Sequence, residues 1–259
     1  MTTDHTDAAG AGPRPTYRDQ RGVAKYRHEV LAVVVRASGT QLEVLVKDRC
    51  REPFTGMPAL PGGPLEVNET MEQAVVRHLR DFLDVSLLGH REQLSTLSEP
   101  GRDPFERTVA TTYLGLVAPD VQANGGARWL PVRESGPMAF DHAHAVEEAV
   151  VRLCGKVSYT NIAHALAPAE FTLAQLRDIY CACLGYDVDV TNLSRVLRRR
   201  GQIVKTGHLA ESGQRGGRPP ATWTFTRHDY EVTDPFAVLR PASRDKQSRT
   251  SRGLGCEVL

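Results

Sequence analysis

Residues 60–84 read LPGGPLEVNETMEQAVVRHLRDFLD, a turn rich in glycine and proline followed by a helical pattern. Apolar side chains recur there with the spacing of one helix face, at Met71, Ala74, Val75, Leu79 and Phe82. The spacing predicts a helix over Glu69–Leu83. Asn68 is expected to cap its N-terminus, where Glu69 and Glu72 complement the helix dipole. The segment therefore predicts a loop that leads directly into an amphipathic helix.

Short runs of β-branched residues flank this segment on both sides. Val30–Val35 and Leu42–Val46 are expected strands, separated by a turn at Ser38–Gly39. Thr108–Val117 and Ala127–Val132 are expected strands on the other side. Strands that alternate with a helix and hairpin-length turns are typical of a mixed α+β layer fold.

A second pattern, of a different kind, follows from about residue 143. Three helices are expected, over Val146–Val157, Phe171–Leu184 and Val190–Arg200. The second begins at Thr172 and ends at Gly185, and the third begins at Asp189 and ends at Gly201. Two strands, Gln202–Thr206 and Ala221–Phe225, enclose a loop of glycines and arginines. Two helices across a short turn, followed by such a hairpin, predict a winged helix-turn-helix.

The two patterns share no repeat and predict two different domains, residues 28–142 and 143–230. Residues 1–27 lack an apolar period and are expected to form a flexible arm. Residues 231–259 contain several basic side chains among Ser, Thr and Gly, which predicts a flexible basic tail.

Composition narrows the class of protein. The chain has 259 residues, 41% of them hydrophobic, and a formal net charge of +1. It contains neither an apolar run long enough to span a membrane nor a secretory signal, so a cytoplasmic protein without membrane contact is expected. Cys181 and Cys183 lie in a helical pattern without further ligands at zinc-binding spacing, so no structural metal is expected. Residues 186–218 carry seven bases against three acids, a balance typical of small nucleic-acid-binding modules.

The segment from Gly63 onward resembles the Nudix box, G-x5-E-x7-R-E-U-x-E-E-x-G-U, in which U is aliphatic. Gly63, Glu69 and Arg77 match the box. The three catalytic glutamate positions hold His78, Asp81 and Phe82 instead, and the following glycine position holds Asp84. Nudix hydrolases use those carboxylates to hold Mg²⁺ against a pyrophosphate. The resemblance therefore implies a Nudix-like α/β/α sandwich domain without catalytic residues or a metal site.

Further motifs resemble the NrtR family, the Nudix-related transcriptional regulators of NAD metabolism. They are Gly101-Arg-Asp-Pro104, Ala139-Phe-Asp-His142, Phe171-Thr-Leu-Ala-Gln-Leu176 with Tyr180 and Gly185, Asn192-Leu-Ser-Arg195, Gly207, and Gly217-Arg-Pro219 with the strand to Phe225. The resemblance implies a homodimer that represses NAD biosynthesis or salvage genes. It binds double-stranded palindromic operator DNA and needs no cofactor. ADP-ribose, or a related NAD metabolite, is the expected effector.

The same resemblance implies two sets of site residues. Those expected to bind the effector are Gly62, Gly63, Glu69, Arg77, Arg102, Asp103, Asp141 and His142. Taken alone, Arg102 and Asp103 fit an ordinary loop, and Asp141 fits a helix N-cap.

Those expected to bind DNA are Thr191, Asn192, Ser194, Arg195, Arg198, Arg199, Lys205, Thr206, Arg215 and Arg218. Asn192 can pair with adenine, and Arg195 and Arg199 share a face that can reach guanine or phosphate. Arg198 and Arg200 are expected at the DNA backbone or in solvent, and Val196 and Leu197 are expected to pack inward.

Two alternatives stay open from the sequence. The chain could be a divergent Nudix hydrolase of ADP-ribose or a related nucleoside diphosphate, in which Glu66, Glu69 and Glu72 hold a metal in another arrangement. It could also be a regulator that has lost effector binding and serves only as a DNA-binding module.

Overall fold

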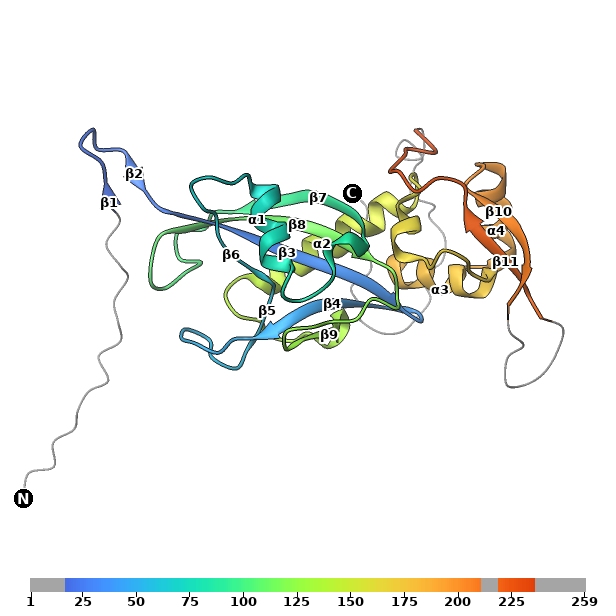
Figure 1. Cartoon of the computed structure of the whole chain (residues 1–259), viewed down its shortest axis with the longest axis horizontal. Coiled ribbons are helices and arrows are strands. Elements are labelled where there is room, and N and C mark those ends of the chain that lie inside the picture. Colours follow the sequence, from blue (N-terminus) through green and yellow to red (C-terminus); the bar gives the residue numbers. More distant parts are fainter. Residues whose placement is uncertain (1–16, 211–218, 236–259) are drawn as a thin grey trace, which may run out of the picture.

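A seven-stranded mixed sheet forms the larger part of the molecule (Figure 1). The computed structural model describes residues 17–210 and 219–235. The strands are β3 (Arg27–Ser38), β4 (Gln41–Asp48), β5 (Pro58–Ala59), β6 (Gly62–Pro64), β7 (Leu88–Leu97), β8 (Thr108–Val117) and β9 (Ala127–Pro131). Their order is β5-β4-β3-β8-β7, with β6 paired to β3 and β9 paired to β4. Only the central pair β3 and β8 is parallel among these pairings.

Helices cover both faces of this sheet, which explains why β3 is apolar without alternation. Val30, Ala32 and Val34 pack with buried residues of α1 (Met71–Leu79). Leu31, Val33 and Val35 belong to the cluster that includes α2 (His142–Val157). Successive side chains of a strand point to opposite faces, so a strand with two covered faces is apolar throughout. The expected α/β/α arrangement of this domain is confirmed.

Helix α1 differs from its prediction at both ends. Its N-cap is Thr70, not Asn68, and Thr70 forms a capping box with Gln73. The helix ends at Leu79, so Asp81 and Phe82 lie beyond it. The predicted helix over Glu69–Leu83 is therefore too long. The apolar period continues past Leu79 because Leu83 is buried in the same core from a turn.

The predicted winged helix-turn-helix is confirmed. Helix α3 (Leu173–Leu184) begins after Thr172 and ends at Gly185, whose φ is +76°. Helix α4 (Val190–Arg199) begins after Asp189, whose side chain accepts a hydrogen bond from the Asn192 backbone N–H. Strands β10 (Ile203–Leu209) and β11 (Ala221–Phe225) pair antiparallel and form the wing. Cys181 and Cys183 lie buried in α3 as free thiols.

The two units share a continuous apolar core. One cluster of buried residues runs from Leu31 of the sheet through Leu153 of α2 and Ile162 to Leu176 of α3 and Phe225 of the wing. Ile162 lies in a short 3-10 helix, η3 (Ile162–Leu166), which no local pattern predicts. Helix α2 begins at the predicted domain boundary and packs against both the sheet and α3.

The ends of the described chain are more ordered than predicted. Strands β1 (Tyr17–Arg18) and β2 (Ala24–Lys25) pair as a hairpin within the expected arm, which Figure 1 shows projecting from the sheet. Residues 231–234, assigned to a flexible tail, are instead bonded to the body, for example through the Thr233 backbone N–H to the Tyr159 carbonyl. Residues 1–16 of the arm and 236–259 of the tail lie outside the described residues. Among the helices that the structure describes, none is long and apolar enough to cross a membrane.

Candidate functional site

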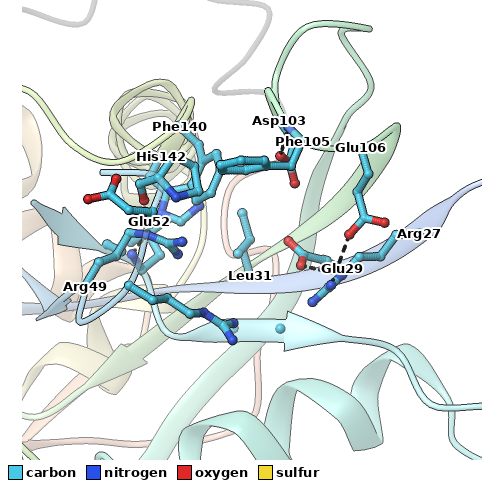
Figure 2. Close-up of a pocket in the computed structure, with 16 residues that line it drawn as sticks. Arg27, Glu29, Leu31, Arg49, Glu52, Asp103, Phe105, Glu106, Phe140 and His142 are labelled. Carbon is cyan, nitrogen blue, oxygen red and sulfur yellow. Dashed lines mark hydrogen bonds and ion pairs between the residues drawn. The ribbon is translucent and has the colours of Figure 1, made fainter. Parts of the chain in front are cut away.

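A cavity of about 320 Å³ opens where β3, β6 and the β4–β5 loop meet the β7–β8 loop and the loop before α2 (Figure 2). Its charged lining side chains are Arg27, Arg49, Arg51, Glu29, Glu52, Asp103 and Glu106. Phe105 and Phe140 supply aromatic rings. Gly62 and Gly63 lie at the wall, where the Cβ of any other residue at position 62 would be 2.3 Å from the Val30 carbonyl oxygen. The cavity therefore combines cationic, anionic and aromatic groups in one place.

His142, one of the predicted effector residues, lines this cavity as a neutral base. Its Nδ1 accepts a hydrogen bond from the backbone N–H of Leu60 at 3.0 Å, which places the ring proton on Nε2. Burial lowers the pKa of His142 to about 3, and the neighbouring Arg102 adds to this effect while Asp141 opposes it. His142 therefore stays uncharged throughout the physiological range.

This burial predicts a pH dependence of stability. The unfolded chain protonates His142 near pH 6.5, whereas the folded chain resists protonation until about pH 3. The unfolded state binds more protons between these values, so the free energy of unfolding should fall as the pH drops from 6.5 toward 3. Denaturant titrations over this range should show a weaker decline in His142→Asn. Because burial also lowers the pKa of His164, a His164→Asn variant serves as the comparison. An identical pH slope in wild type and His142→Asn would contradict the assignment.

Arg102 and Asp141 are bonded to each other. The Arg102 Nε and Nη2 donate to the two carboxylate oxygens of Asp141 at 2.8 and 2.7 Å. The Arg102 side chain is 2% exposed, and neither residue lines the cavity. Direct contact of this pair with an effector is therefore not supported. The pair instead ties the loop that carries Asp103 to the N-terminus of α2.

Phe140 lines the cavity and has a strained backbone conformation. Its φ is +53°, and Phe54 in the β4–β5 loop has a φ of +68°. The two rings meet edge to face at 4.9 Å, and the Arg49 guanidinium lies 4.6 Å from the centre of the Phe140 ring. Bulky residues rarely adopt positive φ, and such strain is concentrated at functional sites.

Sequence reasoning missed the lining residues Arg27, Arg49, Arg51, Phe105 and Phe140. A pair of arginines just after an expected strand was the one available signal for Arg49 and Arg51.

The Nudix-box residues Glu69 and Arg77 form an ion pair outside the cavity. Arg77 donates from Nε to Glu69 at 2.9 Å and from Nη2 to the Pro64 carbonyl at 3.0 Å. The hydrogen bond from Arg77 lowers the pKa of Glu69 to about 2. The pair fixes the loop before α1 and offers no free group to the cavity, so the predicted effector contact of these two residues is not supported.

The positions predicted to match the catalytic glutamates of the box do not gather carboxylates. The His78 ring packs against Gly63, with its Nε2 3.1 Å from the Pro64 carbonyl oxygen. Asp81 is exposed beyond the end of α1, and the Phe82 ring lies 5.0 Å from the Lys47 ammonium. Within residues 17–210 and 219–235, no three His, Cys, Asp or Glu side chains are grouped to hold a metal ion.

A second candidate surface lies on α4 and the wing. Leu193 and Leu197 are buried, whereas Thr191, Asn192, Arg195, Arg198 and Arg199 are exposed. The Nη2 of Arg195 donates to the Asn192 side-chain oxygen at 2.8 Å. The amphipathic pattern thus places five of the predicted DNA-binding residues on one exposed surface, as expected for a recognition helix.

The remaining predicted DNA-binding residues differ in their placement. Lys205 is exposed on β10, and its ammonium lies 5.5 Å from the centre of the Trp223 ring. Ser194 is 9% exposed at the floor of a hollow beside Arg195, and the Thr206 hydroxyl is bonded to Thr222. Arg215 and Arg218 lie outside the described residues.

Two expectations for α4 need correction. Arg200 was expected at the DNA backbone or in solvent, yet it turns inward and donates to the Ser158 carbonyl at 2.8 Å. Val196 was expected to pack inward but is only half-buried. Arg200 points inward because it donates a hydrogen bond to the carboxylate of Asp234, which lies in the segment after the wing. No local sequence pattern predicts this contact.

Models of two domain families match this chain. Residues 25–152 match the NUDIX domain model, and residues 163–225 match the model of the NrtR DNA-binding winged helix domain. The ADPR responsive transcriptional repressor NtrR of Acinetobacter baylyi is 27% identical over 78% of this chain and 82% of its own. An ADP-ribose pyrophosphatase of Methanocaldococcus jannaschii is 29% identical over 51% of this chain and 79% of its own. The crystal structure of Shewanella oneidensis NrtR complexed with a 27mer DNA superimposes with a TM-score of 0.67 at 27% identity, and it covers 76% of this chain and 93% of that one.

Proposed function

The chain belongs to the NrtR family, and we propose that it is a transcriptional repressor that binds operator DNA through α4 and the wing and releases it when ADP-ribose binds the cavity. The observation that carries this proposal is a formed, charged cavity joined by α2 to an arginine-rich recognition helix. By analogy with the family, the regulated genes are those of NAD biosynthesis or salvage. On the same analogy, we propose that the protein acts in the cytoplasm.

The lining of the cavity suits a nucleoside diphosphate sugar such as ADP-ribose. Arg49 and Arg51 can donate charge-assisted hydrogen bonds to a diphosphate. The Phe140 ring offers a surface on which an adenine base can stack. The carboxylates of Glu29 and Glu106 can accept hydrogen bonds from ribose hydroxyls. These groups support a nucleoside diphosphate sugar over a purely apolar effector.

The surface of α4 suits the major groove of DNA. Asn192 and Arg195 project side chains with hydrogen-bonding edges for adenine and guanine. Thr191, Arg198 and Arg199 are placed for phosphate contacts, and Lys205 extends the positive surface onto the wing. One such helix reads only a short half-site, so a two-fold symmetric dimer on a palindromic operator is the proposed assembly.

We expect ADP-ribose to bind without being hydrolysed. The catalytic glutamate positions hold His78, Asp81 and Phe82, and Glu69 is bonded to Arg77, so a Mg²⁺ cluster lacks its ligands. Incubation with ADP-ribose and Mg²⁺ or Mn²⁺ should yield no AMP or ribose 5-phosphate by chromatography. Products formed at an ordinary enzymatic rate, and lost in Glu69→Gln, would favour the hydrolase alternative.

A DNA mobility-shift assay on the promoter next to the chain's own gene tests the proposed function. ADP-ribose should weaken the shift, and operator DNA should weaken ADP-ribose binding by the same factor, because coupling between two ligands is reciprocal. Calorimetry that gives equal ADP-ribose affinity with and without operator would reject the switch. The DNA-binding module without effector binding would then be the better description.

A further inference from the structure

The segment after the wing, residues 228–234, lies outside the ranges that match the two domain models and contacts both units. We propose that it is a clasp that positions the recognition helix on the cavity domain, so that the coupling between effector and operator depends on it. The coupling part of this proposal rests on the proposed function. The positioning part concerns the protein alone.

The segment is anchored along its backbone to the turn after α2. Asn161 is 3% exposed, and its side-chain amide donates to the Asp229 carbonyl at 2.8 Å. The Asn161 side-chain oxygen accepts from the Glu231 backbone N–H at 2.7 Å. The Thr233 and Asp234 backbone N–H groups both donate to the Tyr159 carbonyl, at 2.9 and 3.0 Å. Because the buried Asn161 side chain both donates to the segment and accepts from it, these hydrogen bonds fix the position of the segment along the turn.

One end of the segment reaches the cavity domain through Tyr230. Its hydroxyl accepts a hydrogen bond from the Lys156 ammonium at 3.3 Å, and its ring centre lies 5.3 Å from that of His90 on β7. Lys156 and His90 both bond the carboxylate of Glu92, which also accepts from Arg152 at 3.1 Å. Three basic groups from β7 and α2 thus converge on Glu92, and Tyr230 packs against two of them.

The other end reaches the recognition helix. Asp234 accepts from the Nη2 of Arg200 at 2.6 Å, and both side chains are largely buried. The same guanidinium donates to the Ser158 carbonyl at the end of α2. Arg200 is the C-cap residue of α4, so the clasp holds the last turn of the recognition helix against the end of α2.

These polar contacts restrict the two units to one relative arrangement, which the apolar core between them does not do. Apolar side chains tolerate small sliding movements, whereas paired charges and hydrogen bonds are satisfied in one arrangement only. The N-terminus of α2 lies at the cavity through His142, and its C-terminus lies at the clasp through Lys156. A displacement at the cavity can therefore alter the orientation of α4 through these bonds.

The positioning role is tested in the full chain without ligand or DNA. Spin labels carried by a ketone-bearing amino acid at positions 80 and 204, both exposed, report the distance between α1 and the wing. Tyr230→Ala and Asp234→Ala should broaden or shift the distance distribution. Arg227→Ala is the matched control, because it removes only an exposed ion pair with the Glu231 side chain, whereas Glu231 is anchored to Asn161 through its backbone N–H. Distributions identical to wild type in both clasp variants would overturn the proposal.

The coupling role is tested by the mobility shift with and without ADP-ribose. The factor by which ADP-ribose weakens operator binding should fall about tenfold in Tyr230→Ala. ADP-ribose affinity in the absence of DNA should stay unchanged, and Tyr230→Phe, which keeps the ring, should retain part of the coupling. A full coupling factor in Tyr230→Ala would overturn this role. If the wild-type protein does not bind operator DNA but the spin-label distance changes in the clasp variants, the proposed function is refuted and the positioning role is supported.

Discussion

Replacing Asp141 with alanine is expected to lower the free energy of unfolding by about 3–5 kcal/mol, because it leaves the Arg102 guanidinium buried without its counter-ion. The Arg102 side chain is 2% exposed and Asp141 is its bonding partner through two hydrogen bonds. Arg102→Ala should cost less. The carboxylate it leaves behind is 24% exposed and lies at the N-terminus of α2, where the helix dipole favours a negative charge. Denaturant unfolding of the two variants measures the difference.

The double variant Arg102→Met with Asp141→Leu separates the charge effect from packing. Replacement of both partners by apolar residues of similar volume removes the uncompensated charge, so it should recover most of the stability lost in Asp141→Ala. The expected difference in the free energy of unfolding follows directly from the exposure of the two side chains. An equal loss of stability in Arg102→Ala and Asp141→Ala would therefore contradict this account.

Arg195→Ala and Asn192→Ala are each expected to weaken operator binding by about 1–3 kcal/mol and to relax its sequence preference. The two side chains are hydrogen-bonded at 2.8 Å on the exposed face of α4, so Asn192 also orients the guanidinium. Their effects should therefore not be additive, and the double variant should lose less than the sum. Fluorescence anisotropy with operator and scrambled DNA measures affinity and preference together.

Two further variants decide whether Arg195 contacts bases or phosphates. Arg195→Lys keeps the positive charge but loses the planar fork, so base recognition predicts a loss of preference close to that of the alanine variant. Arg80→Ala removes one exposed charge from the cavity domain and serves as the control. Equal weakening on operator and scrambled DNA in Arg195→Ala would assign this residue to the phosphate backbone.

The elements with strong local signals were predictable from the sequence. Strand β8 matches its prediction at both ends, because it is a run of β-branched and apolar residues that ends shortly before Pro119. Helices α3 and α4 were bounded by Thr172, Gly185 and Asp189, whose capping roles depend on groups within a few residues along the chain. Strand β7 was missed because only one of its faces is covered for most of its length, and residues such as Arg91 and Gln93 give it no apolar run.

By itself, the sequence determined the Nudix-like and winged-helix folds and the basic face of α4, and it predicts the loss of the carboxylate cluster. Each of the signals behind these conclusions depends on the identity and spacing of residues close together in the sequence. Only the tertiary structure decided that Arg102 bonds Asp141, that Arg49 and Phe140 share a cavity, and that Asp234 returns to Arg200. These partners are between 34 and 91 positions apart along the chain. Their meeting depends on sheet order and on the path of the chain after the wing, which no local periodicity encodes.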